Sequence, residues 1–245
     1  MPNGGSDCCG TCWFNSKNEG KAGYHAIGKE GEVVCEIRKI KIEDPFWTYC
    51  ANHPHHNLEK ISIPIGAVYI CKENFPYERE VWVMSPDTEQ IRITLLDLLN
   101  KMPEQPISEY PTPTKQDYEV IIQLGLFKEN RAIEGLKRVF EFSIDKSSDS
   151  KNTFVWDRRF TVAYALESLA RISFNEALPF IKRFLTYGLD NKVTDEENRY
   201  AILRYHAVKS LEYCSTKEIK QLLYLAEMDP NLEISTLAKQ LLTKF

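Results

Sequence analysis

The chain has 245 residues, 43% of them hydrophobic and 27% charged, with a formal net charge of −4 at pH 7. These values are typical of a globular protein with one large domain or two smaller ones. No apolar run approaches the roughly 18 residues of a membrane span, and the N-terminus lacks the basic and apolar regions of a signal peptide. Lys and Arg are spread along the chain, which gives no support for a nucleic-acid partner. We therefore expect a cytoplasmic protein without a membrane partner.

Residues 1 to about 57 hold five of the seven cysteines and four of the five histidines. In the reducing cytoplasm, clustered thiols indicate a metal site rather than disulfides. Zinc takes four ligands in a tetrahedron, and residue pairs of the form C-x2-C supply two of them from a tight turn. Cys9 and Cys12 form such a pair, and Cys50 with His53 has the same spacing. The candidate ligands are Cys8, Cys9, Cys12, Cys35, Cys50 and His53.

The order CGTCWFN, CEIR and YCANH resembles the layout of small cysteine-rich zinc or iron modules, in which four cysteines are the ligands. The resemblance implies a closed structural site for zinc, or alternatively iron, held by Cys9, Cys12, Cys35 and Cys50. His53 and Cys8 stay open as alternative ligands. Trp13 and Phe14 should then pack over the C-x2-C turn. The competing interpretation is that the cysteines only fill a small hydrophobic core.

The next part of the chain predicts a short β unit and one helix. Ranges 61–71 and 79–85 are rich in β-branched and aromatic residues and predict two strands joined by a turn. A helix is expected over 85–102, with Asp87 as its N-cap. Residues 103–113 are rich in proline and predict an irregular connector. We therefore expect a first domain over 1–102 and a second over 114–245.

Beyond Thr114 the pattern is helical throughout. Asn130, Asn175 and Ser215 are expected N-caps, and Gly188 is an expected C-terminal stop. The predicted helical segments are 115–127, 131–142, 157–172, 176–188, 198–213, 217–228 and 231–245.

Three stretches, each spanning two of these segments, share one plan: an apolar helix end, a short polar turn, and a helix with apolar residues three apart. They read IIQLGLFKENRAIEGLKRVF, LESLARISFNEALPFIKRFL and AVKSLEYCSTKEIKQLLYLA. Ile133, Leu178 and Ile219 fall into register, at spacings of 45 and then 41 residues. Two-helix repeats of this period resemble HEAT or armadillo repeats, although a generic helical bundle is the alternative. The expected fold is mostly α, with HEAT/armadillo-like repeats preceded by a metal-clipped loop/β unit and two strands.

This layout also resembles bacterial HEAT-repeat proteins of uncharacterised activity. Helical repeats commonly bind partners through an exposed face, and Trp and Arg are over-represented among interface hot spots. The residues expected to bind a partner are therefore Trp156, Arg158, Arg159, Arg199 and Arg204. The alternative for the first three is an ordinary helix start with solvated arginines and a packed tryptophan.

We expect a binding protein rather than an enzyme: a protein-interaction module of the scaffold or immunity type, with a protein or peptide partner. The sequence contains no Gly-rich phosphate loop, nucleophile elbow or H-E-x-x-H motif. Two enzymatic alternatives stay open. One is a HEAT-like, glycosylase-like enzyme acting on nucleic acid, and the other is a metal-dependent hydrolase with an open coordination position.

Overall fold

A computed structural model describes residues 8–46, 48–50, 52–53, 67–74, 77–83, 87–102, 115–142, 159–189, 200–214 and 216–244. For residues 49–50, 67–74, 77–83 and 115–118 it describes the backbone alone. The chain divides into two compact units. One consists of Met1–Leu95 with Thr114–Gln123, and the other of Leu96–Pro113 with Leu124–Phe245.

The two compact units differ from the domains that the sequence predicts. The division passes through α1 (Glu89–Lys101) and α2 (Lys115–Leu126), not through the proline-rich connector. Compact units follow the packing of segments, whereas a change in composition follows only the order of the chain. The connector itself, at 103–113, lies outside the described residues.

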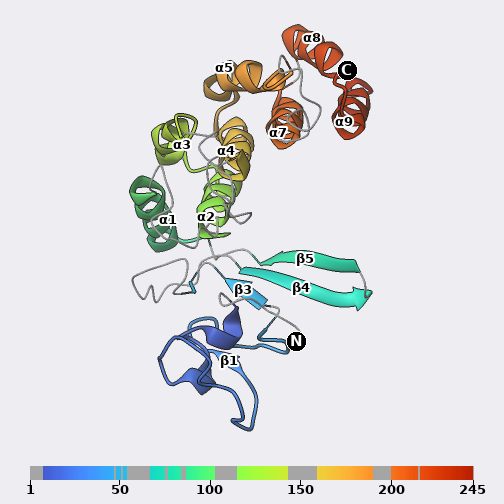
Figure 1. The fold of residues 1–245 in the computed structure, drawn as a ribbon. Coiled ribbons are helices and arrows are strands. Elements are labelled where there is room, and N and C mark those ends of the chain that lie inside the picture. Colours follow the sequence, from blue (N-terminus) through green and yellow to red (C-terminus); the bar gives the residue numbers. More distant parts are fainter. Residues whose placement is uncertain are drawn as a thin grey trace, which may run out of the picture. The chain divides into compact units, whose positions relative to one another are not determined.

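The described part of the chain is mostly helical, as the sequence predicts, and every predicted helical segment contains a helix (Figure 1). After α1 and α2 come α3 (Ile133–Val139), α4 (Arg159–Ile172), α5 (Phe174–Leu185), α7 (Ala201–Ser210), α8 (Lys217–Ala226) and α9 (Leu232–Leu242). Short 3-10 turns are η1 (Cys9–Thr11), η2 (Ser16–Asn18), η3 (Asn130–Ala132) and η4 (Leu211–Tyr213). None of the described helices combines the length and the apolar character needed to cross a membrane.

The predicted helix caps are displaced by one or two residues. Thr88 accepts the N–H of Ile91, while the predicted cap Asp87 instead forms an ion pair with Arg92. Glu129, Ser173 and Thr216 stand at the starts where Asn130, Asn175 and Ser215 were expected. Ser215 lies outside the described residues. Neighbouring oxygen-bearing side chains compete for the same terminal N–H groups, and the sequence does not show which one is placed to accept.

Gly188 does occur just after α5, where its φ of +81° favours glycine. A Cβ atom at this position would lie 3.1 Å from Cβ of Tyr200, so the close approach of the chain also requires glycine.

Two small antiparallel sheets lie in the first unit. β1 (Val34–Cys35) pairs with β2 (Ile40–Lys41), and β3 (Thr48–Cys50), β4 (Ala67–Asn74) and β5 (Tyr77–Val83) form a three-stranded sheet in that order. The β4–β5 pair confirms the predicted strand pair, although β4 continues to Asn74 and leaves a shorter turn. Strand β3 was not predicted, because three residues are too few to show a period. Its pairing sets Cys50 opposite Ala67.

The helices of the second unit form two rows. α3, α5 and α8 lie in one row, and α4, α7 and α9 lie in the other (Figure 1). α4 contacts α3, α5 and α7, while α9 contacts α7 and α8. Lys137 of α3 pairs with Glu176 of α5 at 2.6 Å, and Lys182 of α5 pairs with Glu218 of α8 at 2.5 Å. The three helices that fall into register in the sequence therefore belong to the same row.

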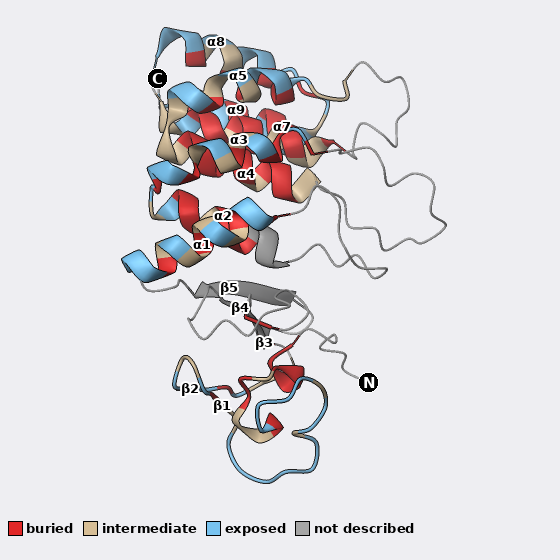
Figure 2. Ribbon diagram, turned by 90° about the vertical axis from the view of Figure 1, so that its left-hand side faces the viewer, coloured by how far each residue is buried: buried red, intermediate tan, exposed pale blue. Residues whose placement is uncertain are grey.

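Burial is concentrated on α4 and α7, in the middle of this unit (Figure 2). The core between the rows is apolar, with Leu166 and Leu169 of α4 and Leu203 and Val208 of α7 fully buried. This pattern is expected for helices that are covered on several sides.

One carboxylate, Glu167, is buried between α4 and α7. Its Oε1 accepts from Nη2 of Arg171 at 2.9 Å, and its Oε2 lies 3.0 Å from Nδ1 of His206 and 3.1 Å from Nζ of Lys209. Burial alone raises the pKa of Glu167, but the hydrogen bond with His206 and the charge of Lys209 outweigh it and lower the pKa to about 2. The carboxylate therefore stabilises the folded chain wherever it is ionised.

We expect Glu167→Gln to lower the free energy of unfolding by about 3 kcal/mol at pH 7, the order given by a shift of this size. A lowered folded-state pKa stabilises above the unfolded value of 4.5, and this contribution is lost as the pH falls from 4.5 towards 2. The difference in the free energy of unfolding between variant and wild type should therefore become smaller over that range. Chemical denaturation at several pH values measures it, with Glu141→Gln as an exposed control. A gap that is independent of pH would contradict the ionic account.

Candidate metal centre

The turn that carries Cys9 and Cys12 is fixed by two buried asparagines. The side-chain amide of Asn15 donates to the carbonyl oxygen of Cys9 at 3.0 Å. The amide of Asn18 donates to the carbonyl oxygens of Gly10, at 3.0 Å, and Cys12, at 2.8 Å. Both asparagines are at most 1% exposed. Because buried carbonyls need donors, these two amides hold the C-x2-C segment in one shape. Sequence reasoning had missed both.

The sulfur of Cys12 accepts a hydrogen bond from the backbone N–H of Phe14 at 3.5 Å. Donors directed at sulfur favour the thiolate, the form that binds metals. Phe14 is itself buried, and Trp13 packs against the same cluster with its ring edge-on to Phe14. The expectation that both rings pack at the C-x2-C turn is confirmed.

Cys35 reaches this turn through the β1–β2 hairpin. An isolated bridge pairs Cys35 with Asn15, and the N–H of Glu36 donates to the carbonyl oxygen of Phe14 at 2.8 Å. The hairpin turn closes through Lys39, whose φ is +55° and whose N–H donates to the carbonyl oxygen of Cys35. The backbone therefore holds a third thiol beside the first two.

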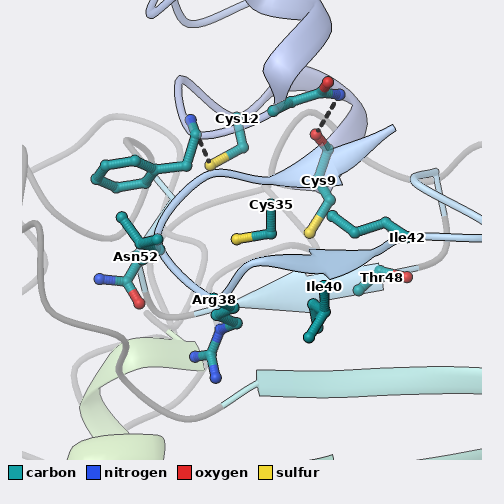
Figure 3. A pocket seen from close by; sticks show the side chains of 11 residues that line it. Cys9, Cys12, Cys35, Arg38, Ile40, Ile42, Thr48 and Asn52 are labelled. Atoms are coloured by element: carbon teal, nitrogen blue, oxygen red, sulfur yellow. Dashed lines mark hydrogen bonds between the residues drawn. The ribbon is translucent and has the colours of Figure 1, made fainter. Parts of the chain in front are cut away.

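Cys9, Cys12 and Cys35 line one small cavity (Figure 3). Its volume of about 20 Å³ suits one water molecule or a single ion, and is far below that of a pocket for an organic ligand. The other lining residues are Phe14, Asn15, Ile37, Arg38, Ile40, Ile42, Thr48 and Asn52. The three sulfurs and the small volume fit a metal ion better than a substrate.

Cys50 lies in the chain between Thr48 and Asn52, which both line this cavity. The Cys50 side chain is outside the described part of the chain.

The alternative ligands are placed differently. His53 and Cys8 are both buried, yet neither lines the cavity. Nε2 of His53 lies 2.8 Å from Oγ1 of Thr11. Among the described side chains, no three Cys, His, Asp or Glu already stand in an arrangement that could hold a metal ion. The structure therefore collects three of the four expected cysteines around a cavity without presenting a finished tetrahedral site.

The residues predicted to bind a partner are distributed unevenly. Trp156, Arg158 and Arg199 lie outside the described residues. Arg159 is the first residue of α4, half-buried, with its guanidinium carbon 5.9 Å from the ring centre of Tyr200.

Arg204 does not lie on the exposed binding surface that the sequence predicts. The side chain is fully buried, and its Nε donates to Oδ2 of Asp229 at 2.7 Å. Its Nη1 donates to the carbonyl oxygen of Tyr187 at 3.0 Å. A buried cation needs such partners, so Arg204 ties α7 to the α8–α9 turn and is a structural residue.

Sequence reasoning also missed an exposed apolar group at the α8–α9 turn. Met228 and Leu232 are 82% and 79% exposed, and Tyr224 and Leu225 are about half exposed. The four residues fall within nine positions of the chain.

If Cys12 is a ligand of the expected metal, Cys12→Ser should remove most of the metal from the purified chain and destabilise the first unit. Cys214→Ser should leave metal content unchanged and stability within about 0.5 kcal/mol, since Cys214 ends η4 in the other unit. Elemental analysis and thermal unfolding of the two variants make the comparison. Equal metal content in both would contradict the assignment.

Comparison with known proteins identifies no relative from which a function could be transferred. No family model matches the chain, and neither the curated proteins nor the solved structures give a match. The functional argument therefore depends on the geometry of the two units.

Proposed function

We propose that the chain is a cytoplasmic protein-interaction module, of the scaffold or immunity type, that binds a protein or peptide through HEAT-like helical repeats. The observation that carries the proposal is the two-row packing of α3, α5 and α8 with α4, α7 and α9. Rows of this kind expose long faces whose side chains can vary without disturbing the core. The apolar group at the α8–α9 turn adds an exposed surface of the type that partners cover.

In this proposal a structural zinc ion, or alternatively iron, holds the segments of the first unit together. Its ligands are Cys9, Cys12, Cys35 and Cys50. The cavity shared by three of these thiols supports the ligand set. Four thiolates and one divalent ion together carry a net negative charge. Arg38, which lines the cavity, would offset part of that charge. When bound, the ion would cross-link segments that are far apart in the sequence.

The enzymatic alternatives have less support. A hydrolase needs room beside its metal for substrate and water, and the volume of about 20 Å³ favours a closed site. A glycosylase-like enzyme needs a nucleic-acid surface, and the overall charge of −4 does not favour one.

We expect Arg158→Glu with Arg159→Glu to weaken binding to the recovered partner at least about tenfold, the order of an interface hot spot. The partner is first isolated by pull-down from the native host. Metal content and helical circular dichroism should stay at wild-type levels. Lys239→Glu with Lys244→Glu, at two exposed positions in and just after α9, is the control matched for the change of charge.

Unchanged binding in the double variant would show that Arg158 and Arg159 do not belong to the partner surface. If Met228→Glu abolished binding instead, the partner surface would lie at the α8–α9 turn.

A further inference from the structure

The segment that follows β3 is tied to the C-x2-C turn by two links from side chains. Nε2 of His53 lies 2.8 Å from Oγ1 of Thr11, which stands inside the turn. The indole N–H of Trp13 donates to the carbonyl oxygen of Asn52 at 3.2 Å. Both links therefore join residues 52–53 to residues 11–13, across about 40 positions of the chain.

The contact with Thr11 engages Nε2 of His53 in either tautomer. The Thr11 hydroxyl lies 2.8 Å from Nε2 and 3.0 Å from the carbonyl oxygen of Cys8. If Nε2 carries the hydrogen, it has no lone pair for a metal, and if it accepts from the hydroxyl, its lone pair is directed at Oγ1. In this arrangement Nε2 is not available as a ligand.

The residues that form these links are also buried. Thr11 is 3% exposed, and Asn52 and His53 are each 1% exposed. Breaking one side of a buried hydrogen bond leaves the other side unsatisfied and costs more than the bond itself contributes. The position of residues 52–53 relative to the turn is therefore strongly held.

We propose that His53 is a positioning residue and not a metal ligand: its bond to Thr11 holds the Cys50 segment against the C-x2-C turn, so that Cys50 completes a four-sulfur site. The inference rests on the metal site proposed above. Cys50 lies between Thr48 and Asn52, which both line the cavity, and His53 follows directly. Outer partners of this kind orient ligands and tune metal affinity without touching the ion.

Cobalt(II) is a suitable probe, because its absorption separates sulfur from nitrogen ligands. The reduced, chelated full chain is titrated with Co²⁺ alone, and affinity is measured by competition with a chelator. The variants are His53→Leu, which removes the bond to Thr11, His53→Gln, whose amide can replace the ring nitrogen, Thr11→Val, and the Leu/Val double variant. His25→Gln, at an exposed histidine of the same unit, is the control.

We expect the same saturated Co²⁺ spectrum in all forms, with thiolate charge-transfer bands and no sign of a lost ligand. His53→Leu and Thr11→Val should each weaken Co²⁺ binding about tenfold or more, the usual effect of an outer partner. The double variant should be no weaker than His53→Leu alone, because both changes remove one bond. His53→Gln should recover most of the affinity, and His25→Gln should match wild type.

Three results would overturn the proposal. A changed saturated spectrum in His53→Leu and His53→Gln alike would make His53 a ligand. Wild-type affinity in His53→Leu would show that the link positions nothing. A wild-type chain that takes up no Co²⁺ with thiolate bands would remove the metal site itself, and with it this role; that failure is distinguishable because it appears before any substitution. Helical circular dichroism checks that each variant is folded.

Discussion

Three thiols converge on one small cavity in the N-terminal part of the first unit. The buried apolar cluster around them consists of Cys9, Cys12, Phe14, Cys35 and Ile42, with three partly buried neighbours. A cluster of this size buries little apolar surface, and small units of this kind commonly use a metal or disulfides. If a metal joins the thiols, its binding free energy becomes folding free energy for this part of the chain. The asparagine-held turn, the hairpin and β3 then all depend on one centre.

The helical unit is stabilised on a different principle. Its core is apolar and continuous between the rows, and its buried charges are paired in place. Glu167 is surrounded by three basic side chains, and Arg204 is held by Asp229 and a backbone carbonyl. Such pairs contribute less through net attraction than through the large cost of removing one partner. They fix how α4, α7 and the α8–α9 turn fit together, which leaves the outer side chains available for other roles.

The features that the sequence predicted correctly depend on residues that are close together in the chain. The C-x2-C pair, the β4–β5 pair and the helical segments each follow from spacing within a few residues, and the structure contains all of them. The register of Ile133, Leu178 and Ile219 was also visible in the sequence, and their helices α3, α5 and α8 lie in one row. The helix caps were misplaced because adjacent polar side chains carry equivalent signals.

What the sequence did not predict depends on distant partners. His53 meets Thr11 across 42 positions, and Arg204 meets Asp229 across 25. Neither partner lies in a pattern that a single sequence shows. The spacing of Cys50 and His53 even suggested a ligand pair, and only the contact with Thr11 indicates another role for His53. Arg204 was likewise read as a surface arginine because its side chain type is common at interfaces.

X-ray absorption at the metal edge of the isolated full chain would show whether the N-terminal site is closed by four sulfur ligands. We expect one zinc or iron ion with four sulfurs, at about 2.3 Å for zinc. A coordination shell with nitrogen or oxygen in place of one sulfur, or a folded chain isolated without metal, would contradict it.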